Sequence, residues 1–291
     1  MKVQHENKVM SSFLQCVDNW IIEKGEAYTN HSSLFYPVEN MYNGYYTYAA
    51  PFKQMISDTS ILGGNYNTDT GPTIMTGVYV DGVLTNVGSS NLAGVNHYDG
   101  QVYFTSDQGS SAISGNYAIK DFNIYLSNDP EERILFESKY HINTKTTQTV
   151  SGLAPETETY PAIYIKNNGG NHTPFALGGV DTNNIDIRAV VLSDSSFKLD
   201  AVCGILKTMH RSYVPILEDL PFNAMNAYTG ENYNYTGLAA KTTGNTLPNP
   251  IIWDIFVSKN VTRGEGLNPG IYTAFVDFKL QYEWRPRREN L

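Results

Sequence analysis

Charge is scarce in this sequence. Only 17% of its 291 residues are Asp, Glu, Lys or Arg, against about a quarter in an average soluble domain. Basic residues are the rarer sign, with 20 Lys and Arg against 29 Asp and Glu, and the formal net charge is −9. Because contacts with phosphates need positive charge, we expect no sequence-specific binding to nucleic acid.

Cysteine and long apolar runs are also nearly absent. Cys16 and Cys203 lie far apart in apolar segments without metal-ligand spacing. We therefore expect buried, reduced thiols, as in a protein assembled in the cytoplasm. No segment approaches the roughly 20 apolar residues of a membrane-spanning helix. Residues 1–10 are charged and polar where a signal peptide would be apolar, so we expect neither a membrane location nor secretion.

Tyrosine, in contrast, is abundant. The chain has 21 Tyr against 12 Phe and 3 Trp. Tyrosine gives a broad contact area with one hydrogen-bonding end, which suits protein–protein surfaces. It also favours β-strands, so the composition alone leaves both a binding surface and a β-rich fold open.

Turn signals dominate residues 77–125. Asp81-Gly82 and Asp99-Gly100 each lie between short alternating runs, and Asp-Gly in that setting predicts a β-hairpin. Two long apolar runs at residues 250–261 and 271–284, with glycines between them, predict a closing hairpin. The sequence therefore predicts a scaffold of antiparallel strands.

Two helices accompany these strands. Apolar residues recur at spacings of three and four over residues 6–24, and Gly25 is a suitable C-cap. A strand at 184–193 leads into a helix at 194–210 that begins with capping residues. The expected apolar face of this second helix consists of Phe197, Leu199, Val202, Leu206 and Met209.

The expected fold class is α+β and mostly β, as a twisted mixed or antiparallel sheet or a sandwich, with an N-terminal helix and one covering helix near 196–210. Residues 1–72 are expected to form the helix and an extended Tyr-rich arm, and residues 73–291 the β-rich core. Further expectations are a short helix at 50–57, a strand at 133–142, and a strand at 160–168 that ends at Gly169-Gly170.

The sequence offers no pattern of residues that predicts catalysis. A glycosidase needs two carboxylates that flank a sugar site. The acidic pairs are Glu131-Glu132, Glu218-Asp219 and Asp181/Asp186. Each lies beside turn residues, where acidic side chains commonly cap the backbone or remain in solvent. The six histidines are scattered without metal-ligand spacing, and no serine lies in a nucleophile elbow. We expect a non-enzymatic protein with no catalytic residues, no cofactor and no metal site.

A family resemblance adds a biological setting. VYVDG at 78–82, VNHYDGQVYF at 95–104 and GNYAIKDFNIYL at 115–126 resemble a strand pattern of tailed-bacteriophage virion proteins. Residues 185–209 resemble the strand–helix element of neck and tail-completion proteins. The resemblance implies a virion structural protein, most readily a ring-forming neck component such as a head-to-tail connector, stopper or tail terminator, assembled in the host cytoplasm.

The resemblance to virion proteins also implies partners and an interface. The partners would be copies of the chain, six or twelve to a ring, and virion proteins such as the portal, adaptor, tail tube or sheath. Alternatives are another tail or baseplate protein, a capsid-surface or fibre protein, a glycan-binding receptor module, or a carbohydrate-acting enzyme. The candidate interface residues are Trp20, Tyr36, Tyr42, Tyr45, Tyr46, Tyr48, Arg285, Arg287 and Arg288.

Overall fold

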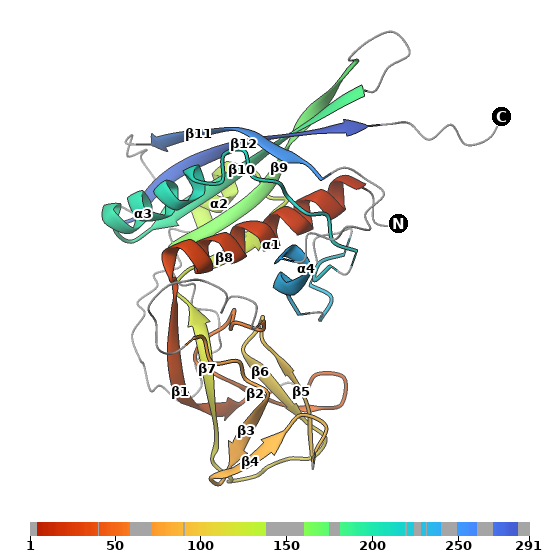
Figure 1. Ribbon diagram of the computed structural model, residues 1–291. Coiled ribbons are helices and arrows are strands. Elements are labelled where there is room, and N and C mark those ends of the chain that lie inside the picture. Colours follow the sequence, from red (N-terminus) through yellow and green to blue (C-terminus); the bar gives the residue numbers. More distant parts are fainter. Residues whose placement is uncertain are drawn as a thin grey trace, which may run out of the picture. The chain divides into compact units, whose positions relative to one another are not determined.

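The fold is built mainly from two antiparallel sheets, with a long helix at the N-terminus (Figure 1). This confirms the expected α+β, mostly β class. The computed structural model describes residues 5–39, 41–58, 71–89, 91–137, 160–174, 181–218, 220–223, 228–230, 232–239, 249–260 and 270–284.

The chain divides into two compact units. Unit 1 comprises Met1–Gly25, Ile124–Tyr140 and Tyr160–Leu291, and unit 2 comprises Glu26–Asn123 and His141–Thr159. Most of unit 2 is therefore an insertion between the N-terminal helix and the rest of unit 1. This division differs from the expected boundary at residues 72 and 73, because the N-terminal helix belongs with the C-terminal half of the chain.

Unit 1 contains a five-stranded sheet in the order β11-β12-β10-β9-β8, with every pairing described for β9 to β12 antiparallel. The expected closing hairpin is confirmed, since β11 pairs with β12. The elements of this unit are α1 (His5–Gly25), β8 (Asn123–Leu126), α2 (Glu131–Glu137), β9 (Ala162–Pro174), β10 (Asp181–Ser193), α3 (Ser196–Lys207), α4 (Tyr235–Ala239), β11 (Ile251–Asn260) and β12 (Tyr272–Trp284).

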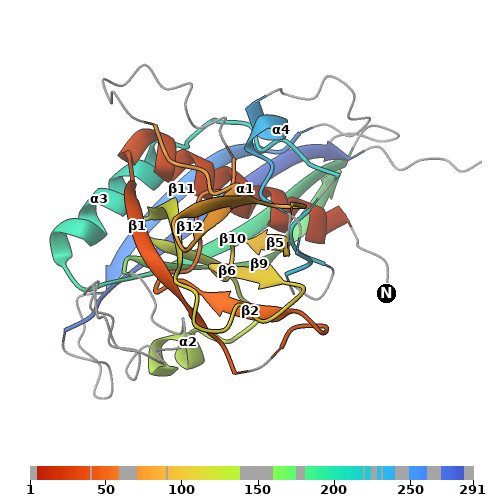
Figure 2. The same cartoon turned by 90° about the horizontal axis from the view of Figure 1, so that it is seen from below.

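Helix α1 packs on one face of this sheet and alongside α3 (Figures 1 and 2). Phe13 of α1 meets Phe278 of β12 edge to face, with ring centroids 5.0 Å apart. Polar residues of the helix are buried as well. The side chain of Gln15 accepts a hydrogen bond from the backbone N–H of Asn234 at 2.8 Å, and that of Asp18 accepts one from the hydroxyl of Tyr235. The helix is thus covered both by the sheet and by the segment that carries α4.

Unit 2 contains a seven-stranded sheet in the order β4-β3-β7-β1-β2-β6-β5, whose strands are labelled in Figure 1 and which surrounds one core and nearly closes. The residues expected to form an extended arm supply two of these strands, β1 and β2. The strands are β1 (Tyr28–Pro37), β2 (Tyr46–Ala49), β3 (Gly77–Val80), β4 (Val83–Asn86), β5 (Leu92–Asn96), β6 (Gln101–Phe104) and β7 (Ile113–Lys120).

Both Asp-Gly turns lie where the sequence predicts them. Asp81 and Gly82 have φ angles of 49° and 83° and join β3 to β4. Two consecutive residues with positive φ form the type I′ turn that matches the twist of a hairpin. Gly100, with a φ of 67°, precedes β6 in the turn that follows β5.

Three expected elements are wrong. Residues 50–57 form no helix, because the amides of Met55 and Ile56 donate to the carbonyls of His97 and Ala118. Residues 131–137 form helix α2 rather than the start of a strand, and the rest of 133–142 lies outside the described residues. Helix formation there follows from Pro130, which favours a helix start, and from two acids in the first turn.

The third wrong element concerns β9, which does not end at Gly169-Gly170 but continues to Pro174. The ladder with β10 is irregular between Ile185 and Ile187. There a Cβ at Gly170 would collide with the carbonyl oxygen of Asn184. The glycine is therefore required by close backbone approach inside a strand, rather than by a chain reversal.

Helix α3 is confirmed, but one residue of its expected apolar face is not. Leu199, Val202 and Leu206 are buried, whereas Phe197 is 85% exposed. Positions three or four apart share a helix face, and Phe197 precedes Leu199 by only two residues. It therefore points away from the stripe that packs on the sheet.

Candidate functional site

A tight hairpin in unit 2 presents aromatic side chains to solvent. Tyr42 and Tyr45 exchange backbone hydrogen bonds of 3.1 and 2.8 Å across Asn43 and Gly44, whose φ angles are 48° and 83°. This is a two-residue turn with both φ angles positive, which Asn-Gly favours. Tyr42 is 58% exposed at its tip, and Met41 beside it is also exposed.

The ring of Tyr42 is held by a second tyrosine. It stacks on Tyr103 of β6 with centroids 5.3 Å apart and planes at 26°. The Tyr103 hydroxyl donates to Gln101 at 3.1 Å and accepts from the amide of Asn96 at 3.2 Å. Asn96 also donates to Asp99 at 2.7 Å. One exposed aromatic face is therefore fixed above a set of amide and carboxylate groups.

The structure separates the other predicted tyrosines from this tip. Tyr48 is buried in the core of unit 2, where its hydroxyl donates to Asp107 at 2.9 Å, and its burial raises its pKa. Tyr46 is partly buried against the same core, and Tyr36 is half-buried. Only Tyr42 and Tyr45 of the predicted tyrosines are exposed enough to meet a partner.

The remaining predicted interface residues lie elsewhere in the sequence. Trp20 is half-buried in unit 1, where its indole N–H donates to the hydroxyl of Thr208 at 2.9 Å. The ammonium of Lys24 lies 5.4 Å from the centroid of that indole. Arg285, Arg287 and Arg288 lie outside the described residues.

A second exposed surface lies on unit 1, at the outer strand β11. Trp253 and Phe256 of this strand are 53% and 64% exposed. The guanidinium of Arg211 lies 5.5 Å from the centroid of the Trp253 ring, within the range of a cation–π contact. Tyr213 and Phe197 of the same unit are exposed as well.

A third exposed surface, which the sequence analysis missed, is the outer strand β4 of unit 2. Val83 and Leu84 are 70% and 51% exposed, and Val87 just beyond the strand is exposed too. A signal for it exists in the sequence, because successive residues of a strand point to opposite faces. Two adjacent large apolar residues after the Asp81-Gly82 turn cannot both face one core.

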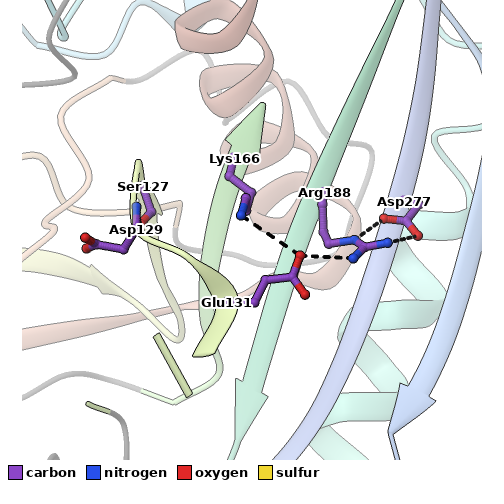
Figure 3. Close-up of polar contacts among 6 residues, drawn as sticks. All are labelled: Ser127, Asp129, Glu131, Lys166, Arg188 and Asp277. Carbon is purple, nitrogen blue, oxygen red and sulfur yellow. Dashed lines mark hydrogen bonds and ion pairs between the residues drawn. The ribbon is translucent and has the colours of Figure 1, made fainter. Parts of the chain in front are cut away.

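A charged network on unit 1 joins α2 to the sheet (Figure 3). Arg188 of β10 donates through Nε and Nη2 to Asp277 of β12 at 2.6 and 2.9 Å, and through Nη1 to Glu131 of α2 at 2.9 Å. Lys166 of β9 lies 4.0 Å from the same Glu131 oxygen. The hydrogen bond to Asp277, aided by that to Glu131, raises the pKa of Arg188.

This network is suited to holding structure rather than to proton transfer. A bidentate guanidinium–carboxylate pair fixes the geometry of both groups, and both carboxylate oxygens of Asp277 accept hydrogen bonds from Arg188. Beside it, Val190 and Leu192 of β10 pack against Ile134 of α2. The ion pairs and this apolar cluster together fix α2 on the face of the sheet opposite Phe278.

Across the described residues, no group of three or more His, Cys, Asp or Glu is arranged to hold a metal ion. No described helix is long and apolar enough to cross a membrane. Both cysteines are free thiols, and burial raises the pKa of Cys16 to about 12.

Comparison with known proteins does not assign a family. No model of a known protein family matches the sequence, and no curated protein matches it significantly.

Proposed function

We propose that this chain is a structural protein of a tailed-bacteriophage virion that assembles with copies of itself into a ring in the neck. The observation that carries the proposal is that each unit exposes its own apolar surface. Unit 2 exposes Val83 and Leu84, and unit 1 exposes Trp253 and Phe256. Grouped exposed apolar residues mark interaction sites.

Ring assembly needs such a pair of unlike surfaces. In a closed ring each subunit contacts its two neighbours through two different patches. A single self-complementary patch would give a dimer instead. The two units of this chain supply two patches that differ in sequence and in strand arrangement.

The charge balance agrees with a place beside the DNA channel. A net charge of −9 lets DNA pass without adhering to the protein. The partners we propose are copies of the chain, in rings of six or twelve, and neighbouring virion proteins such as the portal, adaptor, tail tube or sheath. Its location would be the virion, after assembly in the host cytoplasm.

Native mass spectrometry of the full-length protein over a range of concentrations tests this function. We expect a discrete ring, or a monomer that converts to a ring when a portal or tail protein is added. A stable trimer would instead indicate a fibre protein. A protein that stays monomeric alone and also after a portal or a tail protein is added would contradict the proposal.

A second candidate function, glycan binding at the virion surface, is favoured by the Tyr42–Tyr103 stack. It places an exposed aromatic face beside Asn96, Asp99 and Gln101. Apolar rings with a few fixed polar groups are the usual composition of small-ligand sites.

The Tyr42→Ala variant distinguishes the two functions. Loss of glycan binding with assembly intact would favour the receptor module. The matched variant Tyr42→Phe keeps the stacked ring and should behave as wild type in either case. If Tyr42→Ala changes neither property, the hairpin tip is not a binding site.

A further inference from the structure

Strand β11 is an outer strand whose edge is only partly covered. It ends the five-stranded sheet. In the part of the chain that the structure describes, residues 211–214 pair along its outer edge at Ile251 and Ile252 alone, with hydrogen bonds of 2.8 and 2.9 Å at Ile252. The ladder with β12 is irregular between Ile252 and Asp254. Beyond that point the Ile255 amide donates to the carboxylate of Asp254 at 2.9 Å, and Lys259 pairs with Asp200 of α3. Among the described residues no further strand pairs with the outer side of residues 254–259, so this part of the edge can accept another strand.

Strand β4 is one of the two outer strands of the unit 2 sheet, the other being β5. It ends the seven-stranded sheet and pairs with β3 through all four of its residues. Its sequence, Val-Leu-Thr-Asn, contains neither charge nor proline. Natural outer strands are usually protected by lysine, proline or a covering segment, whereas this one exposes two apolar side chains, Val83 and Leu84.

The two edges fit each other in length and in charge. The central residues of the free β11 edge, 255–258, are uncharged and equal in number to those of β4. The charges of β11 lie at its two ends, at Asp254 and Lys259. Pairing with an uncharged strand therefore brings no like charges together, and it covers Phe256 with apolar side chains.

We propose that β4 of one copy pairs with the β11 edge of the next copy, so that the sheets of neighbouring subunits join. The contact is heterologous, because it uses unit 2 of one subunit and unit 1 of the other. It covers the outer edges of β4 and β11, whereas pairing β11 with β11 would leave β4 open. This inference rests on the proposed ring and identifies the surfaces that close it.

Charge-bearing variants of the full-length protein test the contact. Leu84→Lys and Phe256→Lys each place a charge on one edge, at a side chain that is exposed. Each should raise the concentration needed for assembly at least tenfold in native mass spectrometry. Leu34→Lys is the matched control for β4, since Leu34 is exposed on β1 between two paired strands. Phe197→Lys on α3 is the control for β11.

Mixing the two variants gives the decisive result. Each variant keeps the edge that the other has lost, so an equal mixture should form a one-to-one heterodimer and no ring, while both controls assemble as wild type. Loss of assembly in Phe256→Lys but not in Leu84→Lys would overturn the contact in favour of β11 pairing with itself. Circular dichroism of each variant confirms that it is folded.

The contact and the ring can fail separately. Rings that form in both edge variants would overturn this contact and leave the proposed function standing. A wild-type chain that stays monomeric alone overturns the contact, and the proposed function then depends on ring formation with a portal or tail protein. A mixture that yields no heterodimer likewise overturns the contact.

Discussion

At the scale of single residues, burial separates the tyrosines that build the core from those that can meet a partner. Tyr48 and Tyr117 are buried with their hydroxyls hydrogen-bonded, whereas Tyr42 lies at the tip of an Asn-Gly turn. The sequence shows only that tyrosine is abundant. Which tyrosines reach solvent depends on turn geometry and strand register, and short aromatic runs do not encode these unambiguously.

Tyr117 should make the protein sensitive to alkali. Burial raises its pKa to about 12, although its hydroxyl contacts that of Ser33 at 2.6 Å. An unfolded tyrosine titrates near pH 10, so this stabilisation is complete below about pH 10 and is lost as the pH rises through 12. Tyr117→Phe should therefore show a smaller loss of unfolding free energy between pH 8 and 11 than wild type, measured by urea unfolding.

The control for this prediction is Tyr213→Phe, because Tyr213 is exposed. It should lose as much stability as wild type over the same pH range. At pH 8, Tyr117→Phe should cost about 1 kcal/mol through its lost hydrogen bond. If its alkaline loss equals that of wild type, burial of Tyr117 does not control the titration.

At the scale of elements, local sequence rules predict strands and turns better than they predict edges. The Asp81-Gly82 turn and the β11–β12 hairpin follow from residues close together in the chain. That β4 and β11 are outer strands depends on the order of strands across each sheet, which pairs residues far apart in sequence. Alternation along β4 therefore shows that Val83 and Leu84 face opposite sides, but not that the strand lies at the edge of its sheet.

The Arg188 network should stabilise the attachment of α2. Arg188→Met leaves Asp277 and Glu131 without their guanidinium partner, and all three side chains are about one quarter exposed. We expect a loss of about 1–2 kcal/mol in urea unfolding, below the cost of a fully buried pair because water screens the charges. Arg133→Met is the control, since Arg133 pairs with Asp129 at the surface, and it should cost at most about 0.5 kcal/mol. Equal losses would contradict a role for the network.

Tyr235 should hold the α4 segment on α1. Its hydroxyl donates to the buried carboxylate of Asp18. Tyr235→Phe removes that donor and leaves the buried carboxyl group of Asp18 with one hydrogen bond fewer, which costs about 1–3 kcal/mol. Thermal unfolding followed by circular dichroism measures the loss. Tyr213→Phe, at an exposed side chain, should leave the unfolding temperature unchanged, and a similar result for Tyr235→Phe would show that the contact contributes nothing.

At the scale of the whole molecule, the division into two units was the least accessible feature from sequence. No linker composition marks residues 25–26 or 123–124, because the chain leaves one unit in a helix and returns to it in a strand. The crossing points at residues 25–26 and 123–124 are distant in sequence. The pairing of β1 with β7, which joins Tyr28 to Lys120, brings them together.

Two cores should give two unfolding transitions. Leu92 is buried in unit 2 and Leu192 in unit 1, and replacing either with alanine removes about 2–5 kcal/mol from its own core. In differential scanning calorimetry we expect Leu92→Ala to lower one transition and Leu192→Ala the other. A single transition that both variants lower equally would show that the units unfold together.

The insertion also affects the order in which the chain can fold during synthesis. Phe13 packs on Phe278, so α1 leaves the ribosome long before the strand that covers it exists. At about 5–20 residues per second, α1 waits for roughly 13–53 s. Unit 2 is complete in sequence much earlier and can fold during that interval. A nascent chain therefore carries a folded middle and an uncovered apolar helix, which makes newly made protein a natural client for a chaperone.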